Sequence, residues 1–332
     1  MTPPPLKTTP GSPALRGRRL PPREVVFALV GLALVLALGV ICNADGVFFI
    51  RGIHADALWQ NAAFGVLACG MTIVIISGGI DLSVGSVAAL AGVVFADQLM
   101  KHEAGGARSC LAAIVAGGLC GLVNGSLVAF LRVQPFVATL AMMAFARGLA
   151  KWLAGGQVIT KYPYPPVVEL LNTRFPVLGL DLSLHVFVFL ACVLLTLGFL
   201  RATTGGLYVY ALGDNELAAR FAGIPLRLLK VGVYTISGLS AGVAGILFAV
   251  LERQGNPDGA AGAELTAIAM VVVGGTALSG GRGGILLTVL GALTITYLRK
   301  ILDINAVETH MQLMITGGII VLAVLAQSLR RR

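Results

Sequence analysis

Long apolar stretches recur along the chain from residue 25 to residue 327, and this pattern constrains the fold more than any other feature. The chain has 332 residues, of which 57% are apolar and only 12% are charged. A water-soluble domain has about 25% charged residues, so these stretches belong in lipid. A backbone that crosses lipid must satisfy its own hydrogen bonds, which favours helices. The sequence therefore predicts an all-α polytopic membrane protein.

The number of crossings follows from the lengths of the apolar stretches. A membrane-spanning helix needs about 20 mostly apolar residues. Two stretches, 84–99 and 264–279, are short and contain glycines, which is typical of discontinuous helices held inside a bundle. We expect about ten spans, at 25–42, 62–78, 84–99, 109–131, 134–154, 184–200, 231–251, 264–279, 283–298 and 310–327.

The basic residues predict the orientation of these spans. Most of the 24 Lys and Arg residues fall on the side of the N-terminus, so by the positive-inside rule both termini are cytoplasmic. Residues 1–24 are predicted to be a disordered basic tail that can touch membrane lipid, and residues 328–332 a second basic tail. A single transmembrane domain, 25–327, lies between the tails. No basic face is interleaved with aromatic residues, so nucleic-acid binding is not expected.

Chemistry within this chain alone is not expected. The five cysteines and four histidines are scattered, which argues against a disulfide framework and against a metal site. The phosphate-binding pattern GxxxxGK[ST] is missing from the sequence, so the chain cannot hold ATP by itself. The spans contain no arrangement typical of nucleophilic or metal-dependent catalysis. We therefore predict no catalytic residue, no metal and no cofactor in this chain.

A short glycine-rich motif, GG-x-x-LS-x-G, occurs twice, at residues 78–85 and 274–281. Each copy follows a β-branched run and precedes a new apolar span at the same predicted side, which makes it a candidate parallel internal repeat. Paired glycines permit a break in helical geometry. We expect a structural role for Gly78, Gly79, Ser83, Gly85, Gly274, Gly275, Ser279 and Gly281.

The first copy of the motif carries Asp81, where the second copy has Ala277. A carboxylate at the bilayer centre costs roughly 2.5–3.5 kcal/mol, so Asp81 must face the interface, a wet cavity or a bonded protein pocket. Asp81 or Ser83 can cap the helix that begins near Val84. Two roles stay open for Asp81, a helix cap, which is favoured, and a substrate or gating residue.

Residues 201–230 form the longest loop on the predicted cytoplasmic side. Asp214 is a good N-cap, residues 216–222 form a compact helical run, and Gly223 is expected to end it. Small side chains around one large apolar residue, Phe221, favour docking against another protein with Phe221 as the anchor. The alternative is a helix that lies on the lipid surface.

The segments SGGIDLSVGS (77–86), VNGSLVAFLRVQPFVATLAMM (123–143), YALGDNELAARFAGI (210–224) and GGTALSGGRGGILLTVLGAL (274–293) carry a family resemblance. In this order and spacing they resemble the ribose-type permeases of ATP-binding-cassette importers, which are related to branched-chain amino-acid permeases. Galactofuranose-type permeases are at least as similar. The resemblance extends from about residue 60 to the C-terminus.

This resemblance implies a permease subunit in a bacterial inner membrane that translocates a pentose or a hexose. It implies as partners a second permease subunit, identical or different, ATP-binding subunits that hold ATP and Mg, and a periplasmic sugar-binding protein. It also implies that residues 211–224 form the coupling helix that docks into an ATPase subunit. The coupling residues would be Asp214, Glu216, Arg220, Phe221 and Gly223.

Polar side chains within spans are costly unless they face protein or a cavity. Candidates for the substrate pathway are therefore Asp81, Asn124 and Gln134, together with the nearby Phe136. Structural roles compete with this one, since Asn124 can bond across helices and Gln134 can mark the start of a span. Two other functions stay open. One is a permease for another small polar solute such as an amino acid, and the other is an ion-coupled transporter that would use Asp81, Arg147 and Glu264.

Overall fold

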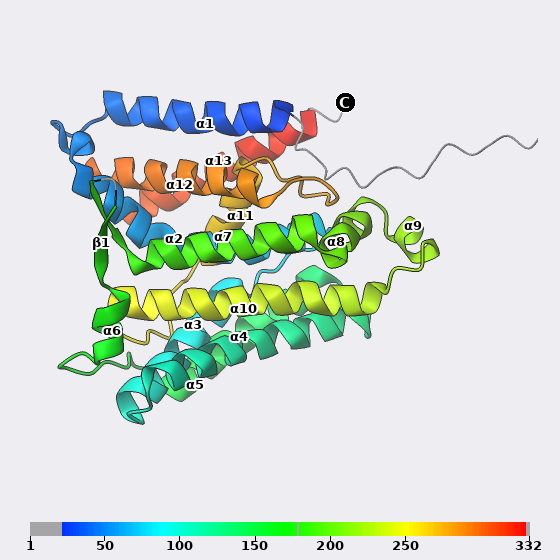
Figure 1. The fold of residues 1–332 in the computed structure, drawn as a ribbon, viewed down its shortest axis with the longest axis horizontal. Helices are drawn as coiled ribbons and strands as arrows, with labels where there is room; N and C mark the ends of the chain where they lie inside the picture. The colour runs from blue at the N-terminus through cyan, green and yellow to red at the C-terminus, as the bar shows by residue number, and fades with distance from the viewer. Residues whose placement is uncertain (1–21, 178, 330–332) are drawn as a thin grey trace, which may run out of the picture.

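The computed structural model describes residues 22–177 and 179–329, and it is a bundle of helices that run along the long axis of the molecule (Figure 1). The α-helices are α1 (Pro22–Ile41), α2 (Arg51–Ile76), α3 (Val84–Ala96), α4 (Gly106–Ala129), α5 (Pro135–Ala154), α6 (Pro166–Leu171), α7 (Leu184–Ala202), α8 (Thr204–Asp214), α9 (Glu216–Phe221), α10 (Leu226–Glu252), α11 (Ala263–Val273), α12 (Ile285–Ile304) and α13 (Thr309–Leu329). A 3-10 turn, η1 (Val47–Phe49), and a π-turn, η2 (Asp97–Lys101), follow α1 and α3. Two antiparallel strands, β1 (Arg174–Val177) and β2 (Leu180–Ser183), precede α7.

The prediction of an all-α polytopic membrane protein is confirmed. Every predicted span contains a helix, but among the described residues only 8 helices, not about ten, are long and apolar enough to cross a membrane, and α11 and α13 are not among them. The span predicted at 264–279 is too long, because α11 ends at Val273 and the glycine motif that follows is not helical.

The predicted boundaries of the tails are shifted by a few residues. Helix α1 already begins at Pro22, and α13 continues to Leu329, so parts of the predicted tails are helical. Residues 1–21 and 330–332, which make up the rest of both tails, lie outside the described residues.

Arg299 and Lys300, which follow the span expected at 283–298, lie inside α12, because this helix continues to Ile304. Arg299 donates a hydrogen bond of 2.6 Å from Nη2 to Oγ1 of Thr266, and its guanidinium carbon lies 4.7 Å from the ring centroid of Phe64. These partners on α11 and α2 let a charged residue continue an apolar helix without facing lipid.

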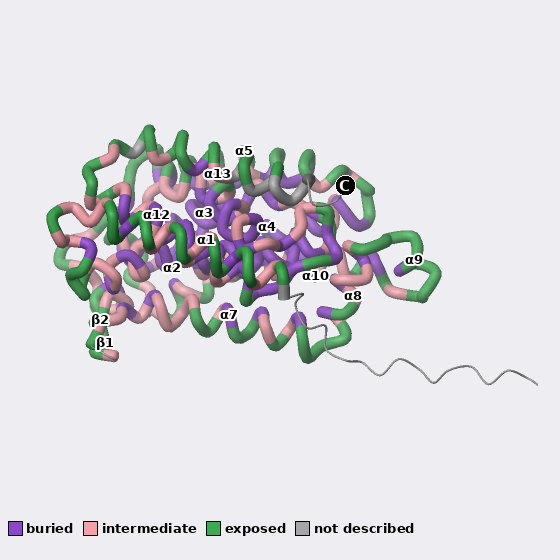
Figure 2. The backbone as a smooth tube through the Cα atoms, turned by 90° about the horizontal axis from the view of Figure 1, so that it is seen from above, coloured by how far each residue is buried: buried purple, intermediate pink, exposed green. Residues whose placement is uncertain are grey.

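The helices form a buried centre and an exposed rim (Figure 2). Helices α2, α3 and α10 are mostly buried, whereas few residues of α1, α5 and α7 are buried. A helix that is apolar on all sides and exposed is suited to a lipid or protein neighbour rather than to water. The rim therefore presents the surface expected of a membrane body.

Helices α4 and α10 make the most extensive contact in the bundle along a seam of glycines. Gly117, Gly121 and Gly125 lie one helical turn apart on α4 and face the backbone of α10. A Cβ added at Gly125 would lie 2.7 Å from Cα of Val231, and one added at Gly242 would lie 2.8 Å from Cα of Ile114. Small residues at such positions let two backbones touch, which is how helices associate without a hydrophobic driving force.

The two ends of the bundle differ. Helix α9 projects from one end, where α1 begins and α13 ends, and the β1–β2 hairpin and α6 cover the opposite end (Figure 1). The hairpin was not predicted, and it is held to α2 by Arg174. This side chain pairs with Asp56 at 2.8 Å and lies 4.6 Å from the ring of Trp59.

We expect Gly121→Ala to destabilise the protein by about 1–3 kcal/mol, because the added Cβ would overlap the carbonyl oxygen of Tyr234. The matched control is Gly148→Ala on α5, where no atom lies within 4 Å of the new Cβ. Thermal unfolding of the purified variants in detergent measures the difference. Equal midpoints for the two variants would show that the seam is not closely packed.

Candidate functional site

Three segments that are distant in sequence meet through their backbones at the end of the bundle that carries α9. We call Gly78, Gly213, Gly280 and Gly281 the glycine junction. The Gly281 N–H donates a hydrogen bond of 2.9 Å to the carbonyl oxygen of Ile76. A Cβ added at Gly280 would lie 2.9 Å from Cα of Gly78 and 3.0 Å from Cα of Gly213. The junction therefore joins the α2–α3 turn, the end of α8 and the α11–α12 loop.

Glycine is required at the junction for conformation as well as for space. Gly78, Gly280 and Gly281 have φ values of +83°, +84° and +72°, in the left-handed region that other residues rarely adopt. The two copies of the sequence motif thus both break the chain after a helix, and they contact each other. Their derivation from a duplication stays a prediction.

The two copies differ in where the next helix begins. Helix α3 begins at Val84, inside the first motif, whereas α12 begins only at Ile285, after the second motif has ended. In the second copy the Ala277 N–H donates to the carbonyl oxygen of Arg282 at 3.1 Å, which closes a separate loop. This loop presents Gly280 and Gly281 to the junction.

Asp81 is buried in protein, with only 1% of its surface exposed. Its Oδ1 accepts hydrogen bonds from the backbone N–H of Ser83 at 3.0 Å and from the Ser83 hydroxyl at 2.6 Å. Its Oδ2 accepts one from the Ser237 hydroxyl on α10 at 2.8 Å, and the Asn124 amide on α4 donates to Ser83 Oγ at 2.9 Å. These four residues, the Asp81 cluster, connect the start of α3 to α10 and α4.

The prediction that Asp81 or Ser83 caps α3 with its side chain is wrong. The helix begins at Val84 as expected, but neither Asp81 nor Ser83 accepts a bond from the free N–H groups of its first turn. Asp81 accepts from the N–H and the hydroxyl of Ser83 instead, and Ser83 Oγ accepts from Asn124. Asp81 was expected to face the interface, a wet cavity or a bonded protein pocket, and it lies in a bonded protein pocket.

The predicted pathway residues fall into two groups. Asp81 and Asn124 meet in the Asp81 cluster, while Gln134 and Phe136 lie at the start of α5. Gln134 lines a cavity of about 790 Å³ between the α4–α5 turn, α9 and the start of α10. Phe136 is exposed on the rim. A role in the substrate pathway stays a prediction for all four residues.

The predicted coupling helix 211–224 is in fact two helices. Asp214 is the last residue of α8 and not the N-cap of α9. Asn215 is the N-cap, since its Oδ1 accepts a hydrogen bond of 3.0 Å from the Ala218 N–H, and its extended backbone separates the two helices. Asn and Asp are equally good caps, so the neighbouring pair left two candidates in the sequence.

The predicted helical run and its end before Gly223 are confirmed, whereas docking against a partner stays a prediction. Helix α9 ends at Phe221, followed by Gly223 with a φ of +77°. Phe221 is 88% exposed, and Glu216 pairs with Lys230 of α10 at 2.8 Å. An exposed aromatic side chain on a short projecting helix suits docking against a partner.

Helix α9 is attached to the glycine junction through the end of α8. A Cβ added at Gly213 would overlap the Ile76 carbonyl oxygen, and one at Gly281 would lie 2.9 Å from Cα of Asp214. Only Asn215 separates this contact from the first residue of α9. Helix α9 therefore begins next to the contact between the two helix breaks.

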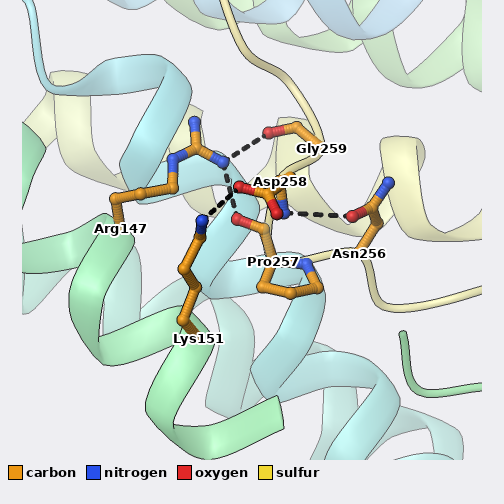
Figure 3. Close-up of polar contacts among 6 residues, drawn as sticks. All are labelled: Arg147, Lys151, Asn256, Pro257, Asp258 and Gly259. Carbon is orange, nitrogen blue, oxygen red and sulfur yellow. Dashed lines mark hydrogen bonds and ion pairs between the residues drawn. The ribbon is translucent and has the colours of Figure 1, made fainter. Parts of the chain in front are cut away.

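The two charged side chains of α5, Arg147 and Lys151, bind the loop between α10 and α11 (Figure 3). Arg147 donates to the carbonyl oxygens of Pro257 and Gly259 at 2.7 and 2.8 Å, and Lys151 pairs with Asp258 at 2.8 Å. The hydrogen bond from Lys151 lowers the pKa of the Asp258 carboxyl. The Arg147 guanidinium thus has a structural role in holding this loop.

Buried helices broken at glycine turns, with a short helix that projects from one end, are typical of membrane transport proteins. Residues 53–324 match the model of the family described as branched-chain amino acid transport system / permease component. The chain belongs to this family of transport permeases.

Three relatives illustrate the similarity. The ribose import permease protein RbsC of Escherichia coli is 35% identical over 297 residues, 90% of this chain and 92% of that protein. The galactofuranose transporter permease protein YtfT of Escherichia coli is 37% identical over 294 residues, covering 86% and 82% of the two chains. The fructose import permease protein FrcC of Rhizobium meliloti is 30% identical over 308 residues, covering 91% and 84%. No solved structure matches the chain.

We expect Asp81→Ala to destabilise the protein, because the Ser83 and Ser237 hydroxyls would lose their buried acceptor. Each unsatisfied donor costs about 1–3 kcal/mol. The control is Asp181→Ala in β2, whose side chain is exposed. Thermal unfolding in detergent compares them, and an unchanged midpoint for Asp81→Ala would contradict a structural role for the carboxylate.

Proposed function

We propose that the chain is the membrane permease subunit of an ATP-binding-cassette importer that translocates a monosaccharide, a pentose or a hexose. The observation that supports this most is the similarity to permeases named for ribose, galactofuranose and fructose, which extends over 86–91% of the chain. In this proposal a periplasmic binding protein delivers the sugar to the outer mouth of the permease.

The energy comes from separate ATP-binding subunits, which hold ATP and Mg, because the sequence lacks the pattern that binds nucleotide phosphates. A second permease subunit, identical or different, completes the pathway, and the exposed apolar rim offers surface for it. We place the chain in a bacterial inner membrane with both termini cytoplasmic. Helix α1 begins and α13 ends at the same end of the bundle (Figure 1), which supports this orientation. The excess of basic residues on the predicted cytoplasmic side supports it as well.

Transport follows alternating access driven by the nucleotide state of the partner. Helix α9 docks into the ATPase with Phe221 as its anchor, and its displacement reaches the glycine junction through Asn215 and Asp214. The junction contacts the α2–α3 turn and the α11–α12 loop, so both helix breaks respond together. Different affinities of the ATPase for nucleotide in the two conformations supply the free energy.

The family description favours one alternative substrate class, since it refers to branched-chain amino acids. An ion-coupled transporter is less well supported, because the ionisable residues it needs are held by their own neighbours. Asp81 is bonded in its cluster, Arg147 binds two carbonyl groups, and Glu264 packs against Gly85, where a Cβ would overlap its carboxylate.

We expect sugar uptake into vesicles that contain the assembled transporter to stop when the phosphate-binding lysine of the ATPase subunit is replaced by alanine. The control is a proton ionophore added to the unmodified transporter, which should leave ATP-driven uptake unchanged. Uptake that survives the lysine replacement and collapses with the proton gradient would overturn the proposal. Uptake of an amino acid in place of a sugar would assign the alternative substrate.

We expect Phe221→Ala to weaken the association of the permease with its ATPase subunit and to leave membrane insertion intact. The physical reason is that the variant loses the exposed aromatic side chain of α9, which would anchor the contact with the ATPase. Phe49→Ala, at the opposite end of the bundle, is the matched control. Co-purification of the tagged ATPase measures the effect, and equal recovery with both variants would exclude Phe221 as an anchor.

A further inference from the structure

The segment between α10 and α11, residues 253–262, is not helical, although it lies beside α3. A Cβ added at Gly255 would overlap Ala96 at the end of α3, and one added at Gly85 near its start would lie 2.8 Å from the carbonyl oxygen of Ala260. The segment therefore follows α3 over nearly its whole length. Helix α11, which comes next, has only 11 residues and is about 16 Å long, roughly half of the hydrocarbon core of a bilayer. Non-helical backbone at membrane depth is tolerated only where protein buries it or where it lines a water-filled cavity.

Four charged side chains lie along this segment, and we call them the polar face: Arg147 and Lys151 of α5, Asp258 of the segment, and Glu264 at the start of α11. Arg147 lies about 18 Å from the start of α5 and about 10 Å from its end, so it is inside the span. Arg147 and Glu264 are half-buried, and the side chains of Lys151 and Asp258 are 50% and 67% exposed. Charged groups within a span face protein or water and not lipid, so the polar face is not a lipid-facing surface.

Arg147 has hydrogen-bond donors that the segment does not use. One nitrogen, Nη1, donates to the carbonyl oxygens of both Pro257 and Gly259, and the other terminal nitrogen points away from them (Figure 3). Nη2 and Nε donate to no residue that the structure describes. A guanidinium carries five N–H donors, so three of them are left for water or for a ligand.

Glu264 lies near Arg147 without meeting it. The two opposite charges act on each other electrostatically, but within the described part of the chain neither forms an ion pair, which places their N and O atoms more than 4.0 Å apart. The Glu264 carboxylate accepts hydrogen bonds only from backbone N–H groups at the start of its own helix, those of Gly262 and Glu264. A polar group between two such charges can bond to both of them, as a bridging water does.

One predicted pathway residue, Phe136, lies on the same side of α5 as Arg147. Phe136, Leu140, Arg147 and Lys151 are separated by 4, 7 and 4 residues, which places them on one stripe of the helix. Phe136 and Leu140 are 55% and 41% exposed. Pro135, beside Phe136, lines the same cavity as Arg220 of α9, so the stripe begins at the end of the bundle that carries α9 and extends toward the opposite end.

We propose that the polar face lines the half of the sugar pathway away from α9, and that Arg147 and Glu264 bind hydroxyl groups of the passing sugar. This inference rests on the proposed function, because it takes the solute to be a monosaccharide. A hydroxyl group both donates and accepts, so a sugar can accept from the guanidinium and donate to the carboxylate at once. The two positive and two negative charges of the face balance, which suits a neutral solute better than an anion or a cation.

The first test is reaction with a membrane-impermeant methanethiosulfonate, which modifies thiols only where water reaches them. The assembled transporter is used in vesicles, after removal of the five native cysteines. Leu265→Cys, next to Glu264, should be modified, and an excess of the transported sugar should slow the reaction. Phe145→Cys is the matched control, since it lies at the level of Arg147 on the opposite side of α5 and should not react. The native side chains are 52% and 62% exposed, so exposure within this chain does not separate them.

The second test is sugar uptake by Glu264→Gln, which keeps the size of the side chain and removes its charge. We expect uptake below saturation to fall roughly tenfold, the lower end of what a hydrogen bond to a charged group contributes. Thermal unfolding and co-purification of the ATPase subunit should be unchanged. The matched control is Glu308→Gln, whose side chain is 73% exposed and lies outside the polar face.

Equal uptake by Glu264→Gln and Glu308→Gln, in a transporter that takes up sugar, would overturn this inference and leave the proposed function standing. Failure of the unmodified transporter to take up any sugar would overturn the proposed function itself. Equal modification of Leu265→Cys and Phe145→Cys, or modification of neither, would show that the polar face does not line a water-filled pathway. Uptake of an amino acid that depends on Glu264 would overturn the assignment to a sugar.

Discussion

Direct backbone contact at the glycine junction is the constraint on which the proposed mechanism depends. The end of α8 can touch the α2–α3 turn and the α11–α12 loop only because Gly78, Gly213 and Gly281 carry no side chain. A backbone contact of this kind has little freedom to slip, and the hydrogen bond from Gly281 to Ile76 fixes its register. In the proposed mechanism, α8 transmits the displacement of α9 through this junction to two buried helix breaks.

The Asp81 cluster explains how a carboxylate is tolerated among buried helices. Three donors from Ser83 and Ser237 replace the water that the charge would otherwise need, and the same bonds tie α3 to α10. The glycine seam then holds α10 against α4. The three helices consequently form one closely packed unit next to the junction.

The sequence predicted the membrane class and the location of nearly every long helix, because hydropathy depends only on local composition. It also located both glycine motifs and the end of α9 shortly before Gly223, since glycine conformation is a local property. It did not predict that Gly213 joins the two motifs, because that contact connects segments far apart in the chain. The cap at Asn215 was missed because the neighbouring Asp214 is an equally good cap in the sequence. The hairpin was missed because it is held by a tertiary contact of Arg174, which hydropathy does not reveal.

The central claim, that α9 and the junction move together, is tested most directly by electron spin resonance distances in the assembled transporter. Labels are placed on Ala222→Cys after α9, Arg282→Cys in the α11–α12 loop and Gln157→Cys at the opposite end, after removal of the five native cysteines. The account predicts that ATP binding leaves the 222–282 distance unchanged while the 222–157 distance shifts. A nucleotide-dependent change in the 222–282 distance would contradict it.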